Sequence, residues 1–247
     1  MKTVIITGAG RGIGRATALL LAQRGYQVVV NYHQRQQTAQ DVVDEIQRAG
    51  GRAIAIQADL ADEAQIVSLF QRVDAEFGAP DALVNNAGIL FSQTRVEELS
   101  ASRINKVFAT NVTGTFICCR EAVKRMALQH GGKGGAIVNI SSVAARVGSP
   151  GEYVDYAASK GAVDTLTRGL ALEVATQGIR VNGVRPGVIY TEMHADGGEP
   201  GRVDRVAPAV PMQRGGQPAE IAEAVAWLLS EAASYVTGSF IDVSGGR

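Results

Sequence analysis

The feature that most constrains this chain is the alternation of short apolar runs with longer stretches of helical periodicity. Seven runs are rich in β-branched residues and bounded by Gly, Asn or Pro, as strands are: residues 3–7, 27–31, 53–57, 82–86, 136–140, 179–184 and 239–243. Nearly every position in them is apolar, which indicates strands covered on both faces. Strands that alternate with helices predict parallel pairing through right-handed crossovers. The expected fold is therefore α/β, a doubly wound seven-stranded parallel sheet of the Rossmann type with helices on both faces.

The stretches between these runs have the periodicity of helices with one buried face. In one of them, apolar residues recur at three and four positions: Ile66, Leu69, Phe70, Val73 and Phe77. No linker, repeat or low-complexity segment interrupts the 247 residues, so we expect a single domain over 1–247. Residues 191–218 hold too many Gly and Pro for one long helix, and we expect them to form a lid over the substrate.

Composition excludes several kinds of partner. Lys plus Arg (24) balance Asp plus Glu (24), so no global field would hold a nucleic acid or an anionic membrane. The two cysteines, Cys118 and Cys119, are adjacent, which suits reduced thiols in a cytoplasmic protein. No signal peptide precedes the first run, and no run approaches the length of a membrane-spanning helix. We expect a small-molecule substrate, with no nucleic acid, no membrane and no metal site.

A glycine-rich turn follows the first expected strand. Gly8, Gly12 and Gly14 stand between that strand and a helical pattern that begins near Ile13. Glycines at this place let the backbone approach a phosphate, and the helix N-terminus offers unpaired N–H groups. The turn therefore predicts binding of a nucleotide pyrophosphate, although glycines alone are also compatible with a tight turn that binds nothing.

Two tyrosines stand close before a lysine in the segment "GEYVDYAASK". In a helix, residues four apart share a face, so Tyr156 neighbours Lys160, whereas Tyr153 has Ala157 at that spacing. An ammonium close to a phenol favours the phenolate, and such a tyrosine would exchange a proton near neutral pH. Taken alone, a tyrosine and a lysine at this spacing mostly belong to an ordinary helix surface.

The order of these motifs resembles the short-chain dehydrogenase/reductase family, in its compact branch. The glycine turn looks like the TGxxxGxG motif of the family, "NNAG" at 85–88 like its strand end, and Tyr156 with Lys160 like its YxxxK pair. Other family positions resemble Asn111 in "TNVTG", Ser142 in "NISSV", with Ser141 the alternative, and the PG turn followed by threonine at Pro186, Gly187 and Thr191. The wider sequence resembles bacterial oxidoreductases that are labelled glucose 1-dehydrogenase-like.

The resemblance implies an NAD(P)-dependent oxidoreductase that transfers a hydride between a nicotinamide and a carbonyl. Negative charge develops on the carbonyl oxygen, so the site needs a proton donor and a hydrogen-bond donor. Tyr156 would supply the proton and Ser142 the hydrogen bond. Lys160 would lower the pKa of Tyr156 and bind the nicotinamide ribose, and Asn111 would hold a water. The substrate would lie against Ser142, Tyr153 and Tyr156.

The resemblance also assigns cofactor contacts along the chain. Beside Tyr156 and Lys160, they are Gly8, Arg11, Gly12, Ile13, Gly14, Asn31, Tyr32, His33, Asp59, Leu60, Asn86, Ala87, Gly88, Pro186, Gly187, Ile189 and Thr191. Members that prefer NAD carry a carboxylate at the end of the second strand, where this chain has Asn31 and Tyr32. Arg11, with His33 or Arg35, would instead meet a 2′-phosphate. We therefore predict that NADP(H) is preferred over NAD(H), the alternative being that these cations are solvated.

The substrate and the assembly are less constrained. The expected lid carries charged residues and no aromatic one, which favours a small polar or sugar-like carbonyl. The alternative within the family is a 3-oxoacyl thioester (acyl-carrier-protein) reductase, which needs basic residues near the site; Arg95, Arg103 and Lys106 are the candidates. Outside the family, the alternatives are a non-catalytic NADP(H)-binding sensor and a methyl-transferring Rossmann protein. Family members are usually tetramers, and two segments carry apolar residues beyond one stripe, so we expect a homotetramer.

Overall fold

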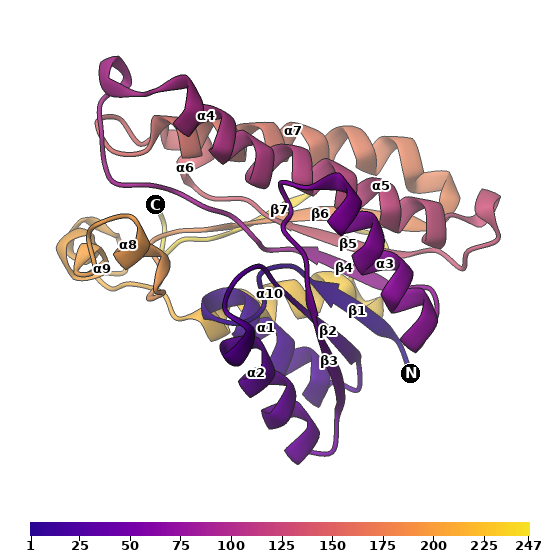
Figure 1. Ribbon diagram of the computed structural model, residues 1–247. Helices are drawn as coiled ribbons and strands as arrows, with labels where there is room; N and C mark the ends of the chain where they lie inside the picture. Colours follow the sequence, from indigo (N-terminus) through magenta and orange to yellow (C-terminus); the bar gives the residue numbers. More distant parts are fainter.

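Seven parallel strands form one sheet in the computed structural model, which describes residues 1–247 (Figure 1). The strand order is β3-β2-β1-β4-β5-β6-β7, and every neighbouring pair is parallel. The strands are β1 (Thr3–Ile6), β2 (Gln27–Tyr32), β3 (Arg52–Gln57), β4 (Ala82–Asn85), β5 (Gly135–Ile140), β6 (Ile179–Pro186) and β7 (Phe240–Val243). All seven apolar runs are strands, and the predicted fold class is confirmed.

Helices cover both faces of the sheet (Figure 1). One face carries α1 (Gly12–Gln23), α2 (Gln36–Arg48) and α10 (Pro218–Leu229); the other carries α3 (Glu63–Phe77), α4 (Ala101–Phe108), α5 (Gly114–Met126) and α7 (Val154–Val174). Each face has its own apolar core, of 24 and 21 buried residues. Val4 and Ile6 of β1 belong to the first core and Ile5 to the second, because successive side chains of a strand point to opposite faces.

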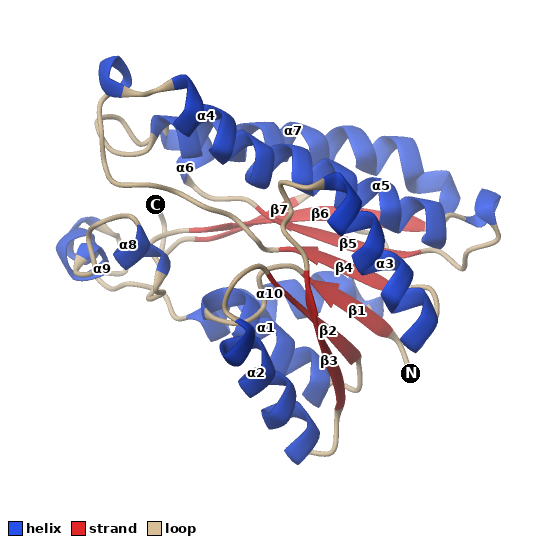
Figure 2. Cartoon of the chain, viewed as in Figure 1, coloured by secondary structure: helices blue, strands red, loops and turns tan.

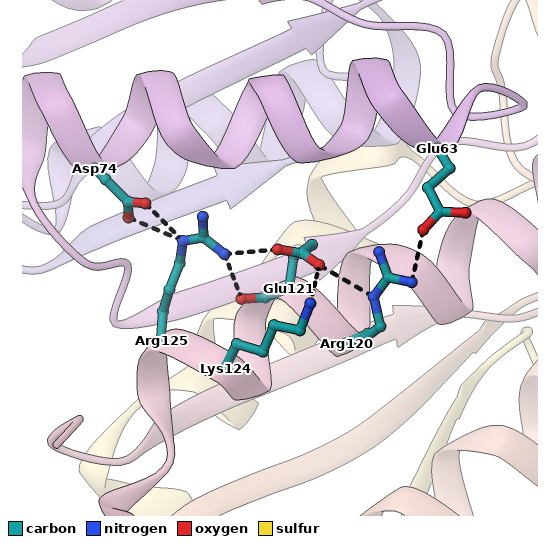
Figure 3. Close-up of polar contacts among 6 residues, drawn as sticks. All are labelled: Glu63, Asp74, Arg120, Glu121, Lys124 and Arg125. Atoms are coloured by element: carbon teal, nitrogen blue, oxygen red, sulfur yellow. Dashed lines mark hydrogen bonds and ion pairs between the residues drawn. The ribbon is translucent and has the colours of Figure 1, made fainter. Parts of the chain in front are cut away.

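The local sequence explains both where the helix α3 begins and which of its faces is buried. The Asp62 side chain accepts hydrogen bonds from the N–H groups of Ala64 (2.9 Å) and Gln65 (3.3 Å), which caps the helix start. The four residues Ile66, Leu69, Phe70 and Val73 form its buried stripe. Ion pairs also join α3 to α5: Glu63 pairs with Arg120 and Asp74 with Arg125 (Figure 3). On α5 itself, Arg120, Lys124 and Arg125 surround Glu121.

The segment 191–218 lacks a long helix, as its Gly and Pro content predicts. It contains α8 (Met193–Asp196), α9 (Arg202–Val206) and a 3-10 turn (Ala207–Ala209), which project beyond the sheet (Figure 1). A small apolar cluster of Val188, Val203, Val206 and Val210 holds the segment together. The remaining short elements are α6 (Ala144–Val147), a π-helical turn (Ala109–Thr113) and 3-10 turns at Val96–Glu98, Leu128–His130, Ala175–Gln177 and Glu231–Ala233.

The carboxyl ends of the parallel strands meet at one edge of the sheet. The long loops after β4, β5 and β6 leave the sheet there, on the side where α8 and α9 lie (Figure 2). In a doubly wound sheet, ligands bind in the crevice outside this edge. No helix of the chain combines the length and the apolar character needed to cross a membrane. No group of three or more His, Cys, Asp or Glu side chains is arranged to hold a metal ion.

Candidate active site

Other parts of the chain lie so close to the glycine turn between β1 and α1 that it has no room for side chains. Gly12 has φ +52°, in the left-handed region that favours glycine. A Cβ on Gly14 would lie 2.5 Å from Asn86 Nδ2 and 2.6 Å from the Gly8 carbonyl oxygen, so no larger residue fits. Asn86 donates hydrogen bonds to the carbonyls of Thr7 (2.9 Å) and Gly8 (3.1 Å). The end of β4 thereby clamps the turn.

Asn31 holds the same turn from the other side. It is fully buried, and its Oδ1 accepts a hydrogen bond from the Gly8 N–H (3.2 Å). Its Nδ2 donates to the carbonyls of Ile56 (3.3 Å) and Ala58 (3.2 Å). Backbone groups therefore occupy the Asn31 amide, which holds the glycine turn in place, and its contact with the cofactor stays a prediction. Beyond it, His33 is exposed, and its Nε2 lies 3.5 Å from Asp59 Oδ2.

The turn has the features of a phosphate site. The helix α1 has no side-chain cap and no acidic residue in its first turn, so its N-terminus keeps its attraction for an anion. Arg11 precedes the helix, and its Nη1 is buried without a hydrogen-bond partner. Thr191 lies directly on Gly12, with its Cγ2 3.2 Å from the position of a Cβ there. Together with the glycines, these groups fit the phosphates of a dinucleotide.

The other residues expected at the cofactor lie at the same edge. Tyr32 ends β2, Asp59 and Leu60 follow β3, and Asn86, Ala87 and Gly88 follow β4. Pro186 ends β6 and is followed by Gly187, Ile189 and Thr191, while Ile13 lies in the first turn of α1. The structure thus brings the expected residues to one edge, with Asn31 turned inward as described.

The tyrosine, serine and lysine of the sequence prediction converge beside this turn. Tyr156 lies in the first turn of α7, Lys160 lies one turn later, and Ser142 follows β5. Lys160 Nζ is 5.6 Å from the centroid of the Tyr156 ring and donates a hydrogen bond to the Ile140 carbonyl (2.7 Å). Ser141, the alternative serine, is buried and its hydroxyl donates to the Lys160 carbonyl (3.3 Å), so Ser142 is the serine that stays partly exposed at the site.

Asn111 lies in the π-helical turn Ala109–Thr113 and is fully buried. Its Oδ1 accepts a hydrogen bond from the Ile89 N–H (2.8 Å), and its Nδ2 donates to the Ile89 carbonyl (2.9 Å) and to Ser159 Oγ (3.1 Å). A Cβ on Gly88 would lie 3.4 Å from Lys160 Nζ and 3.5 Å from Asn111 Oδ1. The asparagine and the lysine therefore face one point, which Gly88 keeps free of side chains.

Tyr153 lies against the segment 191–218. It is buried, and its hydroxyl donates a long hydrogen bond to the Gly197 carbonyl (3.4 Å). The guanidinium of Arg202 stacks over its ring, 5.0 Å from the centroid, and forms an ion pair with Glu152 (2.5 Å). Tyr153 thus connects the start of α7 to the segment 191–218, next to Tyr156.

Comparison with known proteins agrees with this geometry. A family model described as Enoyl-(Acyl carrier protein) reductase matches residues 8–247. A crystal structure of a short-chain type dehydrogenase/reductase from Mycobacterium marinum superposes with a TM-score of 0.92 at 36% identity, over 99% of this chain and 94% of that one. The chain belongs to the short-chain dehydrogenase/reductase family. It is accordingly an oxidoreductase of the NAD(P)-dependent kind, as predicted.

Three curated relatives of this short-chain dehydrogenase/reductase carry different names. An uncharacterized oxidoreductase, YgfF, of Escherichia coli is 68% identical over the full length of both chains. A 3-oxoacyl-[acyl-carrier-protein] reductase, FabG, of Staphylococcus aureus is 40% identical over 99% of this chain and 97% of the relative. Glucose 1-dehydrogenase 2 of Bacillus subtilis is 38% identical over 99% and 94%.

The pKa of Tyr156 differs from what the sequence of this short-chain dehydrogenase/reductase predicts. Burial raises the pKa of Tyr156 to about 12, and a hydrogen bond with Ser142 only partly opposes it. Burial also lowers the pKa of Lys160 to about 8, against the attraction of Asp164. The sequence predicts a tyrosine whose pKa is lowered by Lys160. In this structure, burial sets that pKa and Lys160 does not lower it, because the ammonium points to the Ile140 carbonyl; Tyr156 therefore holds its proton at neutral pH.

Sequence reasoning missed two residues behind the site. Ser159 donates a hydrogen bond to the Tyr156 carbonyl (2.6 Å) and accepts one from Asn111, which ties α7 to the π-helical turn. Asp164 is nearly buried and forms an ion pair with Arg185 (2.8 Å), while one of its oxygens, Oδ1, has no partner. Asp164 stands four residues after Lys160, so helical spacing could have identified it; nothing in the sequence marks Ser159.

Proposed function

We propose that the protein is an NADP(H)-dependent oxidoreductase that interconverts a small polar carbonyl and a secondary alcohol. The observation that carries the proposal is the convergence of Tyr156, Ser142 and Lys160 beside the glycine turn, at the carboxyl edge of the sheet. A protonated phenol, a hydroxyl and an ammonium around one point suit an oxygen that gains negative charge.

Each side chain then has a chemical role. The bound nicotinamide supplies or accepts the hydride. Tyr156, protonated at neutral pH, gives its proton to the carbonyl oxygen, and it takes the proton back when the alcohol is oxidised. Ser142 donates a hydrogen bond to the same oxygen. Lys160 binds the nicotinamide ribose and provides positive charge, and Asn111 holds a water at the point that it shares with Lys160.

The proposed preference for NADP(H) rests on charge at the end of β2. No carboxylate stands at Asn31 or Tyr32, where one would bind the ribose hydroxyls of NAD(H). Arg11 and Arg35 lie close enough together to share one carboxylate of the lid. Two guanidinium groups suit a 2′-phosphate.

The lid supports a small substrate. A Cβ on Gly197 would lie 2.5 Å from Leu90 Cδ1 and 3.1 Å from the Tyr153 hydroxyl, so the segment packs directly on the site. Polar groups surround this contact: Gln93 donates a hydrogen bond to Glu199 (2.5 Å), which also pairs with Arg205. A small polar or sugar-like carbonyl fits such a place better than a bulky apolar one.

A 3-oxoacyl thioester reductase is the second candidate, and the similarity to FabG favours it. That activity needs a basic surface for an acidic carrier protein. Arg103 instead pairs with the buried Asp155 (2.8 Å), and Arg95 pairs with Glu97 (2.5 Å). Only Lys106 of the three candidates has no ion pair, so the geometry ranks this function second.

A substrate screen tests the proposal. Carbonyl compounds, including aldoses and 3-oxoacyl thioesters, are offered with NADPH or NADH, and the corresponding alcohols with the oxidised cofactors. We expect turnover with a higher kcat/KM for NADPH. Tyr156→Phe should reduce kcat about 10²- to 10⁴-fold while NADPH still binds. Tyr153→Phe is the matched control, since it removes a hydroxyl three residues away and should change KM more than kcat.

The outcomes separate the candidates. Turnover confined to acyl thioesters selects the second candidate, and a higher kcat/KM for NADH rejects the cofactor preference. Binding of NADPH without turnover of any compound indicates a sensor, which has no need for Tyr156, Ser142 and Lys160 together. Binding of S-adenosylmethionine in place of NADPH indicates a methyl-transferring protein.

We also propose that the protein works as a homotetramer in the cytoplasm. Two apolar side chains support self-association: Leu172 on α7 is 82% exposed and Phe116 on α5 is 48% exposed. Gly161 and Gly169 on α7 have open space above them, which would let a second helix approach closely. The cysteines Cys118 and Cys119 are buried and free, as suits a reducing compartment.

A further inference from the structure

One carboxylate of the lid lies between the two arginines of the cofactor end. Asp196 ends α8, and its Oδ2 accepts a hydrogen bond from Arg11 Nη2. Its Oδ1 lies 3.4 Å from Arg35 Nη2. Arg11 belongs to the glycine turn and Arg35 follows β2, so this contact joins the lid to two segments that are far from it in the sequence.

Asp196 is the only carboxylate that forms an ion pair with either arginine. It does not use all of their hydrogen-bonding capacity, because Arg11 Nη1 is buried without a partner. A phosphate presents three strong acceptor oxygens where a carboxylate presents two. The two guanidinium groups therefore suit a phosphate better than the carboxylate that now lies between them.

We propose that Asp196 determines cofactor specificity by competing with the 2′-phosphate for Arg11 and Arg35. This inference rests on the proposed use of NADP(H), for which the two arginines provide the binding groups. Asp196 pairs with them while no phosphate is bound and leaves them when a 2′-phosphate arrives. The carboxylate thus weakens the affinity for phosphorylated cofactors and leaves the affinity for unphosphorylated ones unchanged.

The competition also couples the cofactor to the lid. Asp196 is the last residue of α8, whose backbone is held by hydrogen bonds such as Gly197 N–H to the Met193 carbonyl (3.0 Å). A ligand that displaces Asp196 removes the ion pairs that fix this end of the lid, whereas a ligand without a 2′-phosphate does not. The coupling is reciprocal: a change that weakens the ion pairs of Asp196 also tightens binding of the phosphorylated ligand.

Binding of two nucleotide fragments tests the inference without turnover. Adenosine 2′,5′-bisphosphate and adenosine 5′-monophosphate differ only in the 2′-phosphate, and calorimetry gives their dissociation constants. We expect Asp196→Asn to bind the bisphosphate about fivefold more tightly than the unmutated protein, because exposed ion pairs are individually weak. Its affinity for the monophosphate should not change.

Asp204→Asn is the matched control. It makes the same change of charge in the same lid, but Asp204 accepts a hydrogen bond from the Tyr190 hydroxyl (2.7 Å) and touches neither arginine. We expect it to leave both dissociation constants unchanged. An equal gain in the two variants would show a general field effect of the lid and would overturn the inference.

Amide hydrogen exchange provides a second measurement. In the unmutated protein, the bisphosphate should speed exchange over residues 193–198 relative to the monophosphate, and Asp196→Asn should exchange quickly with either ligand. Unchanged exchange together with unchanged affinity in Asp196→Asn would refute the competition. If both proteins prefer the bisphosphate to the same degree, the proposed function stands and this inference fails. Absence of that preference in both proteins refutes the NADP(H) proposal itself.

Discussion

The acid-base chemistry of Tyr156 and Lys160 is set by burial. The pKa of the phenol is raised to about 12 and that of the ammonium is lowered to about 8, chiefly because both lie away from water. Near neutral pH, the tyrosine is therefore protonated and the lysine is charged. This is the protonation state that carbonyl reduction needs, because Tyr156 donates a proton in that direction.

The pH dependence of carbonyl reduction should follow Lys160. Its charge is present below about pH 8 and is lost above it, while Tyr156 stays protonated until about pH 12. We expect kcat/KM for reduction to be level near pH 7 and to fall above about pH 8. Steady-state rates at fixed ionic strength measure this, with cofactor binding at each pH as the control. A rate that climbs from pH 7 to pH 9 would contradict the assignment.

The contact between α3 and α5 depends on one buried carboxylate. Burial alone would raise the pKa of Glu121, but hydrogen bonds from Lys124 (2.9 Å), Arg125 (2.9 Å) and Arg120 (3.0 Å) outweigh it and lower that pKa (Figure 3). Without this charge, three cations of one helix would face each other with only the carboxylates of α3 nearby.

Glu121→Gln should destabilise the fold by about 2 kcal/mol, since each hydrogen bond to a charged group contributes about that much and the cations are partly screened. Urea unfolding at one protein concentration measures the loss. Because the pKa of Glu121 is lowered in the folded chain, its contribution is present above the ordinary value of 4.5 and disappears as the pH falls below it. Glu63→Gln, which breaks only an exposed pair with Arg120, is the control and should cost much less.

The molecule as a whole exposes apolar surface on the face that carries α5 and α7. Leu172 on α7 and Phe116 on α5 are exposed there. Burying one leucine side chain is worth about 1.5–3 kcal/mol, so repetition across symmetric contacts would hold an assembly together.

Light scattering should therefore give a mass near four chains of 25.9 kDa each. Leu172→Asp should shift the distribution to smaller species, while Arg48→Asp, at an exposed position on α2 on the other face of the sheet, should leave it unchanged. A stable monomer in the unmutated protein would contradict the proposed homotetramer.

Much of this molecule could be predicted from the sequence, because the relevant signals are local. The apolar runs set the strands, and the spacing of four residues selected Tyr156 over Tyr153 as the neighbour of Lys160. The glycine turn was equally readable, since close backbone approach tolerates no side chain at Gly14. The burial of a side chain could not be predicted from such local patterns. Burial raises the pKa of Tyr156, whereas the neighbouring Lys160 led us to predict a lower pKa.

The order of residues was thus sufficient for the fold class, the family and the candidates for chemistry, because periodicity and motif spacing act over a few residues. Tertiary structure decided which of those residues meet and in which protonation state. It turned Asn31 inward against the glycine turn, and it placed Asp196 between Arg11 and Arg35. The physical reason is that ion pairs and desolvation depend on distances in space between segments remote in sequence, which no local pattern records.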